Sequence, residues 1–260
     1  MFIDTHCHLN FKEYDLDRAM VIRNAKKAGV KKFINPGVNL FFSKTAVTLA
    51  QKHPGVVFAG IGFHPYEAQH NPEVNELELL LRTKNQEPRT IVAIGECGLD
   101  YHQYKGEAAV GKKDNQKRLF EAQLSLALAY NLPVIIHCRE AFADTFDILD
   151  SLPKMPPGVF HCFSGGLQEL RMATERGFLV GIYGNVTYSK QLELIVPHIP
   201  LSSLLLETDA PYLTPTPHRG SRNEPKYVPL VARKIAELRH VSPNVVEELT
   251  TKNAVNLFSL

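Results

Sequence analysis

Two histidines separated by a single residue near the amino terminus are the first side chains whose types and spacing suit metal binding. The segment over residues 2–8 starts with apolar residues and predicts a strand. Side chains of a strand alternate between its two faces, so His6 and His8 project from one face and Cys7 from the other. Two imidazoles on one face can bind a single metal ion. A buried pair of hydrogen-bonded histidines is the alternative interpretation of this pair alone.

Further histidines and carboxylates follow other apolar segments, each at the point where a predicted strand ends. These residues are His64, Glu96, His137, His161 and Asp209. In a barrel of parallel strands the carboxyl ends converge on one mouth, where barrel active sites lie. Repetition of this pattern after so many strands indicates a metal centre at that mouth.

Four imidazoles and two carboxylates are enough ligands for two divalent cations. Two metals about 3.5–4 Å apart can hold both the attacking and the leaving oxygen of a displacement reaction. A carboxylate must bridge them, and Glu96 is the obvious candidate. Nitrogen and oxygen ligands without thiolate suit Zn²⁺, Mn²⁺ or Mg²⁺, and imidazole favours the first two.

The elements that must position these residues alternate between strand and helix along the whole chain. The predicted strands cover residues 2–8, 32–38, 56–63, 90–95, 134–138, 159–163, 179–183 and 204–207. Helical segments lie between them, for example over 15–28, 43–52, 117–130, 140–149 and 167–176. Two more helices follow the last strand, and Ser242 is the expected N-cap of the second.

Eight such units predict an α/β fold, a single (β/α)8 TIM-type barrel with an extra C-terminal helix. A doubly wound open sheet is the alternative. The length of 260 residues suits one barrel domain over residues 1–260, and 44% hydrophobic residues supply a substantial core. Two long loops interrupt the pattern, over residues 102–115 (with Lys105, Lys112 and Lys113) and over residues 210–225.

Charge and cysteine usage point to a soluble protein of the cytoplasm. The net charge of +2 does not by itself require a polyanionic partner, and no apolar run is long enough to span a membrane. The amino terminus lacks a signal-peptide pattern. Each of the four cysteines, Cys7, Cys97, Cys138 and Cys162, follows a candidate ligand. We therefore expect them to face the helix layer as reduced, small apolar residues.

Eight motifs distributed in order along the chain resemble those of one family. They are DTHCHL, GFHP, IGECGLDY, PVIIHCREA, FHCFSG, LLLETDAPYL, HRGSRNEP and NAVNLF. This set is similar to the TatD family of metal-dependent deoxyribonucleases, within the wider amidohydrolase-like barrel group. The resemblance implies hydrolysis of phosphodiester bonds in DNA, from the 3′ end, with release of nucleotides.

The resemblance also implies a role for each ligand. One metal would be held by His6, His8, Glu96 and Asp209, and the other by Glu96, His137 and His161. The expected catalytic residues are Glu96 and Asp209, with Asp209 as the base that orients or deprotonates the nucleophilic water. The implied cofactors are two divalent metal ions (Zn, Mn or Mg). The implied partner is DNA, single-stranded or at 3′ ends, with no membrane and no obligate protein partner.

Several other residues near the predicted mouth are candidates for contacting the substrate or supporting the ligands. For substrate binding they are His64, Arg139, Arg219 and Arg222, and for support behind the ligands Glu207 and Asp4. A guanidinium can bind phosphate with two hydrogen bonds, and Glu207 could orient a ligand histidine. Tyrosines 66, 101, 183 and 212 follow or end strands and could stack on bases. A packed turn histidine, surface salt bridges and aromatic rims of structural origin are the alternatives.

Two other functions remain compatible with the same residues. A small-molecule amidohydrolase or esterase could use the same metal centre. However, many relatives in the wider group bridge their metals with a carbamylated lysine, and no lysine lies between Ile91 and Tyr104. A non-catalytic nucleic-acid or partner-binding module with a structural metal is the third possibility. It would not need an open coordination position.

Overall fold

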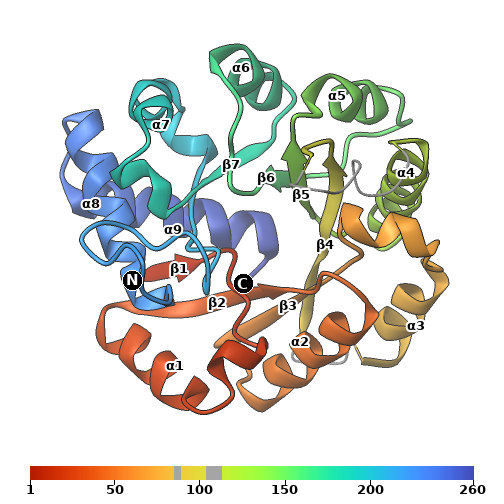
Figure 1. Cartoon of the computed structure of the whole chain (residues 1–260), viewed down its shortest axis with the longest axis horizontal. Helices are drawn as coiled ribbons and strands as arrows, with labels where there is room; N and C mark the ends of the chain where they lie inside the picture. The colour runs from red at the N-terminus through yellow and green to blue at the C-terminus, as the bar shows by residue number, and fades with distance from the viewer. Residues whose placement is uncertain (85–88, 104–112) are drawn as a thin grey trace.

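The computed structural model describes residues 1–84, 89–103 and 113–260, and its eight parallel strands follow one another around a nearly closed barrel (Figure 1). The strands are β1 (Phe2–Asp4), β2 (Val30–Pro36), β3 (Val57–Ile61), β4 (Ile91–Asp100), β5 (Val134–Arg139), β6 (Gly158–Phe160), β7 (Leu179–Ile182) and β8 (Leu204–Leu206). Each strand pairs in parallel with the next in sequence order. The predicted (β/α)8 architecture is therefore confirmed.

Helices connect the strands and form a ring around them in Figure 1. They are α1 (Arg18–Lys27), α2 (Leu40–Lys52), α3 (Asn75–Lys84), α4 (Lys113–Ala129), α5 (Phe142–Asp150), α6 (Leu167–Glu175), α7 (Lys190–Ile195), α8 (Val228–Arg239) and α9 (Pro243–Phe258). Short 3-10 helices include η1 (Lys12–Tyr14), η2 (Pro65–His70) and η3 (Gly184–Thr187). In the predicted polar loop over 102–115, Lys105 and Lys112 lie outside the described residues, and α4 begins earlier than predicted, at Lys113.

The seam between the last and first strands is closed by loops rather than by a regular ladder. The predicted strand over residues 2–8 ends at Asp4, because the following residues alternate between two neighbours. The Thr5 N–H donates to the Leu206 carbonyl at 3.0 Å, whereas the Cys7 N–H donates to the Ile34 carbonyl at 3.1 Å. An isolated parallel bridge joins Cys7 to Ala210. The segment that carries the first two histidines thus holds the barrel together.

The interior of the barrel forms its own apolar cluster. Helix α9 closes the end of the barrel opposite the carboxyl ends of the strands. Inward-facing residues of seven strands meet there: Ile3, Ile34, Phe58, Val92, Ile135, Val159 and Leu205. Ala254 and Phe258 of α9 pack into the same cluster, and α9 runs behind the strands in Figure 1. Because this end is plugged, the open mouth lies at the carboxyl ends of the strands, where barrel enzymes place their chemistry.

The start of α9 follows the sequence signal. The Ser242 hydroxyl accepts a hydrogen bond from the Val245 N–H at 3.4 Å, which confirms the predicted N-cap. Proline at the first helical position costs nothing there, because its missing N–H would have no intrahelical acceptor. Within the described ranges, none of the helices combines the length and the hydropathy that a bilayer crossing requires.

Replacing the plug residue of α9 is expected to destabilise the whole barrel. Phe258 is 1% exposed, and Phe258→Ala would leave a cavity under the strand cluster. The free energy of unfolding should fall by about 3–5 kcal/mol, measured by chemical denaturation. Val245→Ala is the matched control on the same helix, because Val245 is 37% exposed and the change should cost less than about 0.5 kcal/mol. Equal losses in the two variants would contradict the assigned role of α9.

Candidate metal centre

An irregularity in β4 places Glu96 at the centre of the mouth. We expected the fourth strand to end at Gly95, but β4 continues to Asp100, with its register to β5 shifted between Ile94 and Cys97. Gly95 and Gly98 have φ values of +148° and +141°, which side chains disfavour. A Cβ at Gly98 would lie 2.0 Å from the His137 carbonyl oxygen. Only glycine permits this close approach of the two strands.

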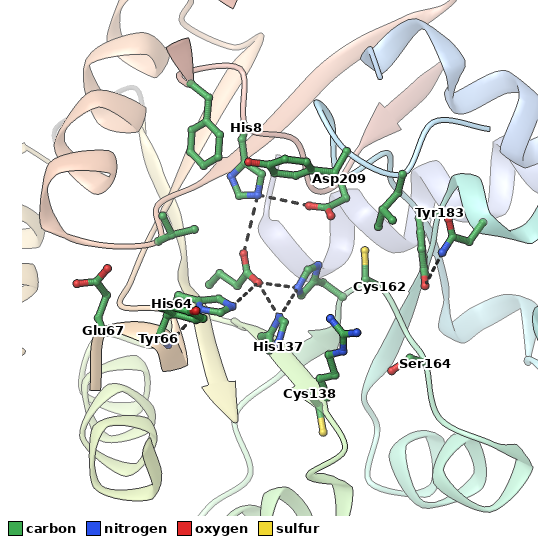
Figure 2. Close-up of a pocket in the computed structure, with 18 residues that line it drawn as sticks. His8, His64, Tyr66, Glu67, His137, Cys138, Cys162, Ser164, Tyr183 and Asp209 are labelled. Carbon is green, nitrogen blue, oxygen red and sulfur yellow. Dashed lines mark hydrogen bonds and ion pairs between the residues drawn. The ribbon is translucent and has the colours of Figure 1, made fainter. Parts of the chain in front are cut away.

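The first group of candidate ligands comes from the loop after β1 and the segment after β8. The Nε2 atoms of His6 and His8 are 3.3 Å apart. The His8 Nε2 lies 3.4 Å from Asp209 Oδ1, and the His6 Nε2 lies 3.3 Å from Glu96 Oε2. Figure 2 shows His8 and Asp209 on one side of the pocket, joined by a dashed line. The predicted projection of both histidines to one face is observed, although the chain here is a loop.

The second group uses the other oxygen of the same carboxylate. Glu96 Oε1 lies 2.9 Å from His137 Nδ1 and 2.8 Å from His161 Nε2. These two ring nitrogens are 3.3 Å apart. Glu96 therefore presents one oxygen to each pair of histidines, which is the arrangement of a bridging ligand. His6, Glu96 and His161 form one cluster able to hold a metal ion, and His6, His8 and Asp209 form another.

The spacing of these atoms fits divalent cations. A tetrahedral ion with bonds of about 2.0–2.1 Å separates its ligand atoms by about 3.3 Å. The observed separations between His6, His8, Glu96 and Asp209 atoms include 3.3, 3.3 and 3.4 Å. Imidazole nitrogens and carboxylate oxygens converge here within reach of a single ion. The donor set is one that divalent metals prefer.

Both carboxylates of the centre are held in their charged form. Burial raises the pKa of Glu96, but the neighbouring His161 and hydrogen bonds from His137 lower it well below its usual value. Burial likewise raises the pKa of Asp209, but the hydrogen bond from His8 and the electrostatic effect of the nearby His6 ring lower it below the usual value. Ionised carboxylates are the form that binds metal.

Asp100 is a residue that the sequence placed at the mouth without a contact to the candidate ligands, and the structure places it against His137. Its Oδ2 lies 3.0 Å from His137 Nε2, on the far side of the ring from Glu96. Burial lowers the pKa of His137, but the bonds to Asp100 and Glu96 prevail and raise it to about 9. A carboxylate behind a ligand histidine fixes the orientation of the ring. The available signal was its spacing of four residues from Glu96, which in a strand keeps both on one face.

The two residues expected to support the ligands, Asp4 and Glu207, accept hydrogen bonds from backbone N–H groups next to the candidate ligands. Asp4 accepts hydrogen bonds from the His6 N–H at 3.3 Å and from the Thr208 N–H at 3.1 Å, so it ties together the two ligand-bearing segments. Glu207 accepts from the N–H of Cys162, which directly follows His161. Burial raises the pKa of Glu207 to about 7. Its position requires Gly181, where a Cβ would lie 2.3 Å from the carboxylate.

A cavity of about 750 Å³ opens above the centre. Two of the four residues predicted to bind substrate line this cavity, and two do not. His64 and Arg139 line it, and His64 Nε2 lies 3.6 Å from Glu96 Oε1. Figure 2 places His64 beside His137 at this wall. Arg219 and Arg222 are not among the described residues that line this cavity.

The two arginines of the long loop after β8 have partners within the protein. Arg219 stacks over the Tyr188 ring at 4.0 Å. Arg222 pairs with Asp17 at 2.6 Å and lies over the Tyr14 ring at 4.6 Å. The Arg222 guanidinium thus ties the loop to Asp17, which directly precedes α1, and a contact of Arg222 with DNA stays a prediction.

One cysteine also departs from expectation. The Cys138 sulfur lies 3.4 Å from the Thr145 hydroxyl of α5, in the helix layer as predicted. Both Cys138 and Cys162 line the cavity, but Cys162 is only half-buried, and its backbone turns at φ +44° immediately after His161. All four cysteines are unpaired.

Comparisons with known proteins agree over the full length of the chain. The family model described as "TatD related DNase" matches residues 3–259. The chain is 38% identical over 263 residues to the "uncharacterized metal-dependent hydrolase YabD" of Bacillus subtilis, covering 100% of both. It is 36% identical over 266 residues to a "3′-5′ ssDNA/RNA exonuclease TatD" of Pectobacterium parmentieri, covering 99% of both. The crystal structure of YJJV, a TatD homologue from Escherichia coli, aligns with TM-score 0.88 at 32% identity, covering 100% of this chain and 98% of that one.

Removing the charge behind His137 is expected to weaken metal binding. Asp100→Asn keeps the shape of the side chain but loses the carboxylate, so affinity should fall by about 10- to 100-fold in an equilibrium titration with Mn²⁺ or Zn²⁺. Asp144→Asn is the matched control, since Asp144 pairs with Lys117 at 2.9 Å outside the centre. Unchanged affinity in Asp100→Asn would show that the orientation of His137 does not depend on this carboxylate.

Proposed function

The chain belongs to the TatD-related DNase family of metal-dependent hydrolases, and on that premise we propose that it is a 3′-5′ exonuclease acting on single-stranded DNA. The observation that carries the proposal is the Glu96 carboxylate, which faces a pair of histidines with each oxygen. We further propose that two divalent ions occupy these positions, as Zn²⁺, Mn²⁺ or Mg²⁺. When bound, such ions supply Lewis-acid stabilisation of the phosphate and an activated water.

Asp209 is the residue best placed to manage the proton of the attacking water. Its side chain is 15% exposed, against 5% for that of Glu96, so it is the ionised carboxylate that opens further into the cavity. A base must reach the proton that it removes, and its pKa must leave it charged at neutral pH. The pKa of Asp209 is held below the usual value, which meets the second requirement, and its exposure to the cavity supports the first.

His64 is suited to donate a hydrogen bond to the substrate. Burial and the neighbouring His137 lower the pKa of His64 to about 3, so the ring is neutral. Its Nδ1 accepts a hydrogen bond from the Tyr66 N–H at 3.2 Å, which leaves the proton on Nε2. That Nε2–H lies 3.6 Å from Glu96 Oε1 at the wall of the cavity, where it would stabilise a phosphate oxygen bound beside this carboxylate without adding a charge.

The lining of the cavity supports an unpaired nucleic acid as substrate. Three of the tyrosines predicted to stack on bases, Tyr66, Tyr183 and Tyr212, line it together with Arg139. Base stacking on aromatic rings requires bases that are not already paired in a duplex. We place the activity in the cytoplasm, within one barrel domain over residues 1–260, which the four free cysteines support.

A small-molecule amidohydrolase or esterase is the less favoured alternative. The full-length relative named as an exonuclease is 36% identical, and a glutamate rather than a modified lysine joins the two halves of this centre. A purely structural metal is disfavoured by the cavity above the ligands, because structural sites are closed.

Nuclease activity is expected to depend on added metal and on residues of both ligand segments. Chelator-stripped protein should leave a 5′-labelled single-stranded oligonucleotide uncut, and Mn²⁺, Zn²⁺ or Mg²⁺ should restore a ladder that shortens from the 3′ end. His6→Ala and Asp209→Ala should each lower the rate by at least about 100-fold, because each removes a ligand or the base. Asp144→Asn should match the wild type.

Three results would count against the proposal in different ways. Near-wild-type activity in His6→Ala or Asp209→Ala would reject the metal centre. Shortening of a 3′-labelled rather than a 5′-labelled strand into a ladder would reverse the direction. An uncut oligonucleotide with every metal, combined with turnover in a panel of cyclic amides, lactones and simple phosphodiesters, would transfer the assignment to a small-molecule hydrolase. RNA of the same sequence tests the breadth of the substrate class.

A further inference from the structure

A second hollow adjoins the cavity above the metal centre. This outer groove has a volume of about 890 Å³ and lies between the loop after β1, η1 and one face of α2 along its length. It shares Phe11, Val38, Glu67 and Tyr212 with the cavity above the metals. A polymer bound at the metal centre can therefore continue into the groove without leaving the protein surface.

A series of aromatic rings leads from the metal centre along this groove. The ring of His8, a candidate ligand, stacks on Phe11 with centroids 4.5 Å apart and planes 15° apart. The Phe11 ring lies 4.6 Å from that of Phe42, and the Phe42 ring lies 5.2 Å from that of Phe41. Phe41 ends the series and is 66% exposed. A phenylalanine this exposed at the end of a groove offers an apolar face to a ligand.

The backbone around these rings is held in place. The Asn39 side chain caps α2 by accepting from the Phe42 N–H at 3.0 Å. The Phe42 carbonyl in turn accepts from the Asn10 side-chain amide at 3.0 Å. The backbone that carries Phe41 and Phe42 is therefore ordered before a ligand binds, which lowers the entropic cost of binding.

Charge contributes little to this groove. Its lining carries three cationic residues, Lys12, Arg18 and Lys52, and three acidic ones, Glu13, Asp15 and Glu67. Arg18 pairs with Asp15 at 2.5 Å. Within the described part of the chain, Lys12 and Lys52 have no ion pair and remain available to phosphates, but the formal charges balance. Affinity in the groove would come mainly from stacking.

We propose that the outer groove is a second subsite, in which Phe41 and Phe42 stack bases on the 5′ side of the scissile bond. This inference rests on the proposed exonuclease function. Because a 3′-5′ enzyme releases the terminal nucleotide, the part of the strand that stays bound is the 5′ part, and the outer groove gives it a continuous path. Longer single strands therefore bind better than a dinucleotide, which fills only the cavity above the metals.

The test compares a hexanucleotide with a dinucleotide of the same 3′ sequence, using the metal-loaded full chain. Phe41→Ala should lower the hexanucleotide-to-dinucleotide ratio of kcat/KM by about 5- to 150-fold, the range measured for loss of one base stack. Most of the change should lie in KM for the hexanucleotide. Phe41→Trp should restore the ratio, since its larger ring keeps the stack. Leu79→Ala, at a leucine 60% exposed on α3, is the control.

Salt provides an independent readout. Stacking releases no counterions, so the effect of Phe41→Ala on the ratio should be the same at about 50 and 200 mM salt. An unchanged ratio in Phe41→Ala would overturn the subsite, and so would equal losses on both substrates, which would indicate a structural role. Failure of the wild type to cut either substrate would instead reject the exonuclease function itself.

Discussion

The two-sided exposure of the Glu96 carboxylate is the constraint on which the rest of the site depends. One oxygen faces the histidines that follow β1, and the other faces His137 of β5 and His161, which directly follows β6. A regular strand does not present a side chain in this way, and β4 achieves it by shifting register where two glycines flank the glutamate. The absence of Cβ atoms at Gly95 and Gly98 is what brings β4 against β5. Every other ligand then needs only to reach a fixed point in the mouth.

Much of this arrangement could be predicted from local patterns in the sequence. Buried parallel strands read as short apolar runs, and a polar residue at the end of such a run lies at the mouth whatever the details of packing. For this reason the barrel, the extra C-terminal helix and the convergence of His6, His8, His137 and His161 followed from spacing alone. The Nε2 atoms of His6 and His8 converge even though β1 ends before them, in a segment whose N–H groups alternate between two neighbours.

The parts that escaped prediction depend on contacts between distant segments. Nothing local shows that Arg222 meets Asp17 of the loop before α1, so its guanidinium looked available for phosphate. Period-two alternation placed Cys162 with the helix layer, but a left-handed turn at that residue directs it to the mouth. The pairing of Asp100 with His137 crosses from β4 to β5 and needs the register of the two strands, which the bulge has altered.

The seam between β8 and β1 gives the metal centre a second consequence. Asp4 and Thr208, which hydrogen-bond across this seam, are 204 positions apart in the chain. The candidate ligands His6, His8 and Asp209 lie immediately beyond it, on both sides. An ion held by all three would be a reversible crosslink between the first and last strands, closing a loop that includes most of the protein. Like a disulfide of the same span, it would restrict the unfolded chain, but chelation can undo it without any redox chemistry.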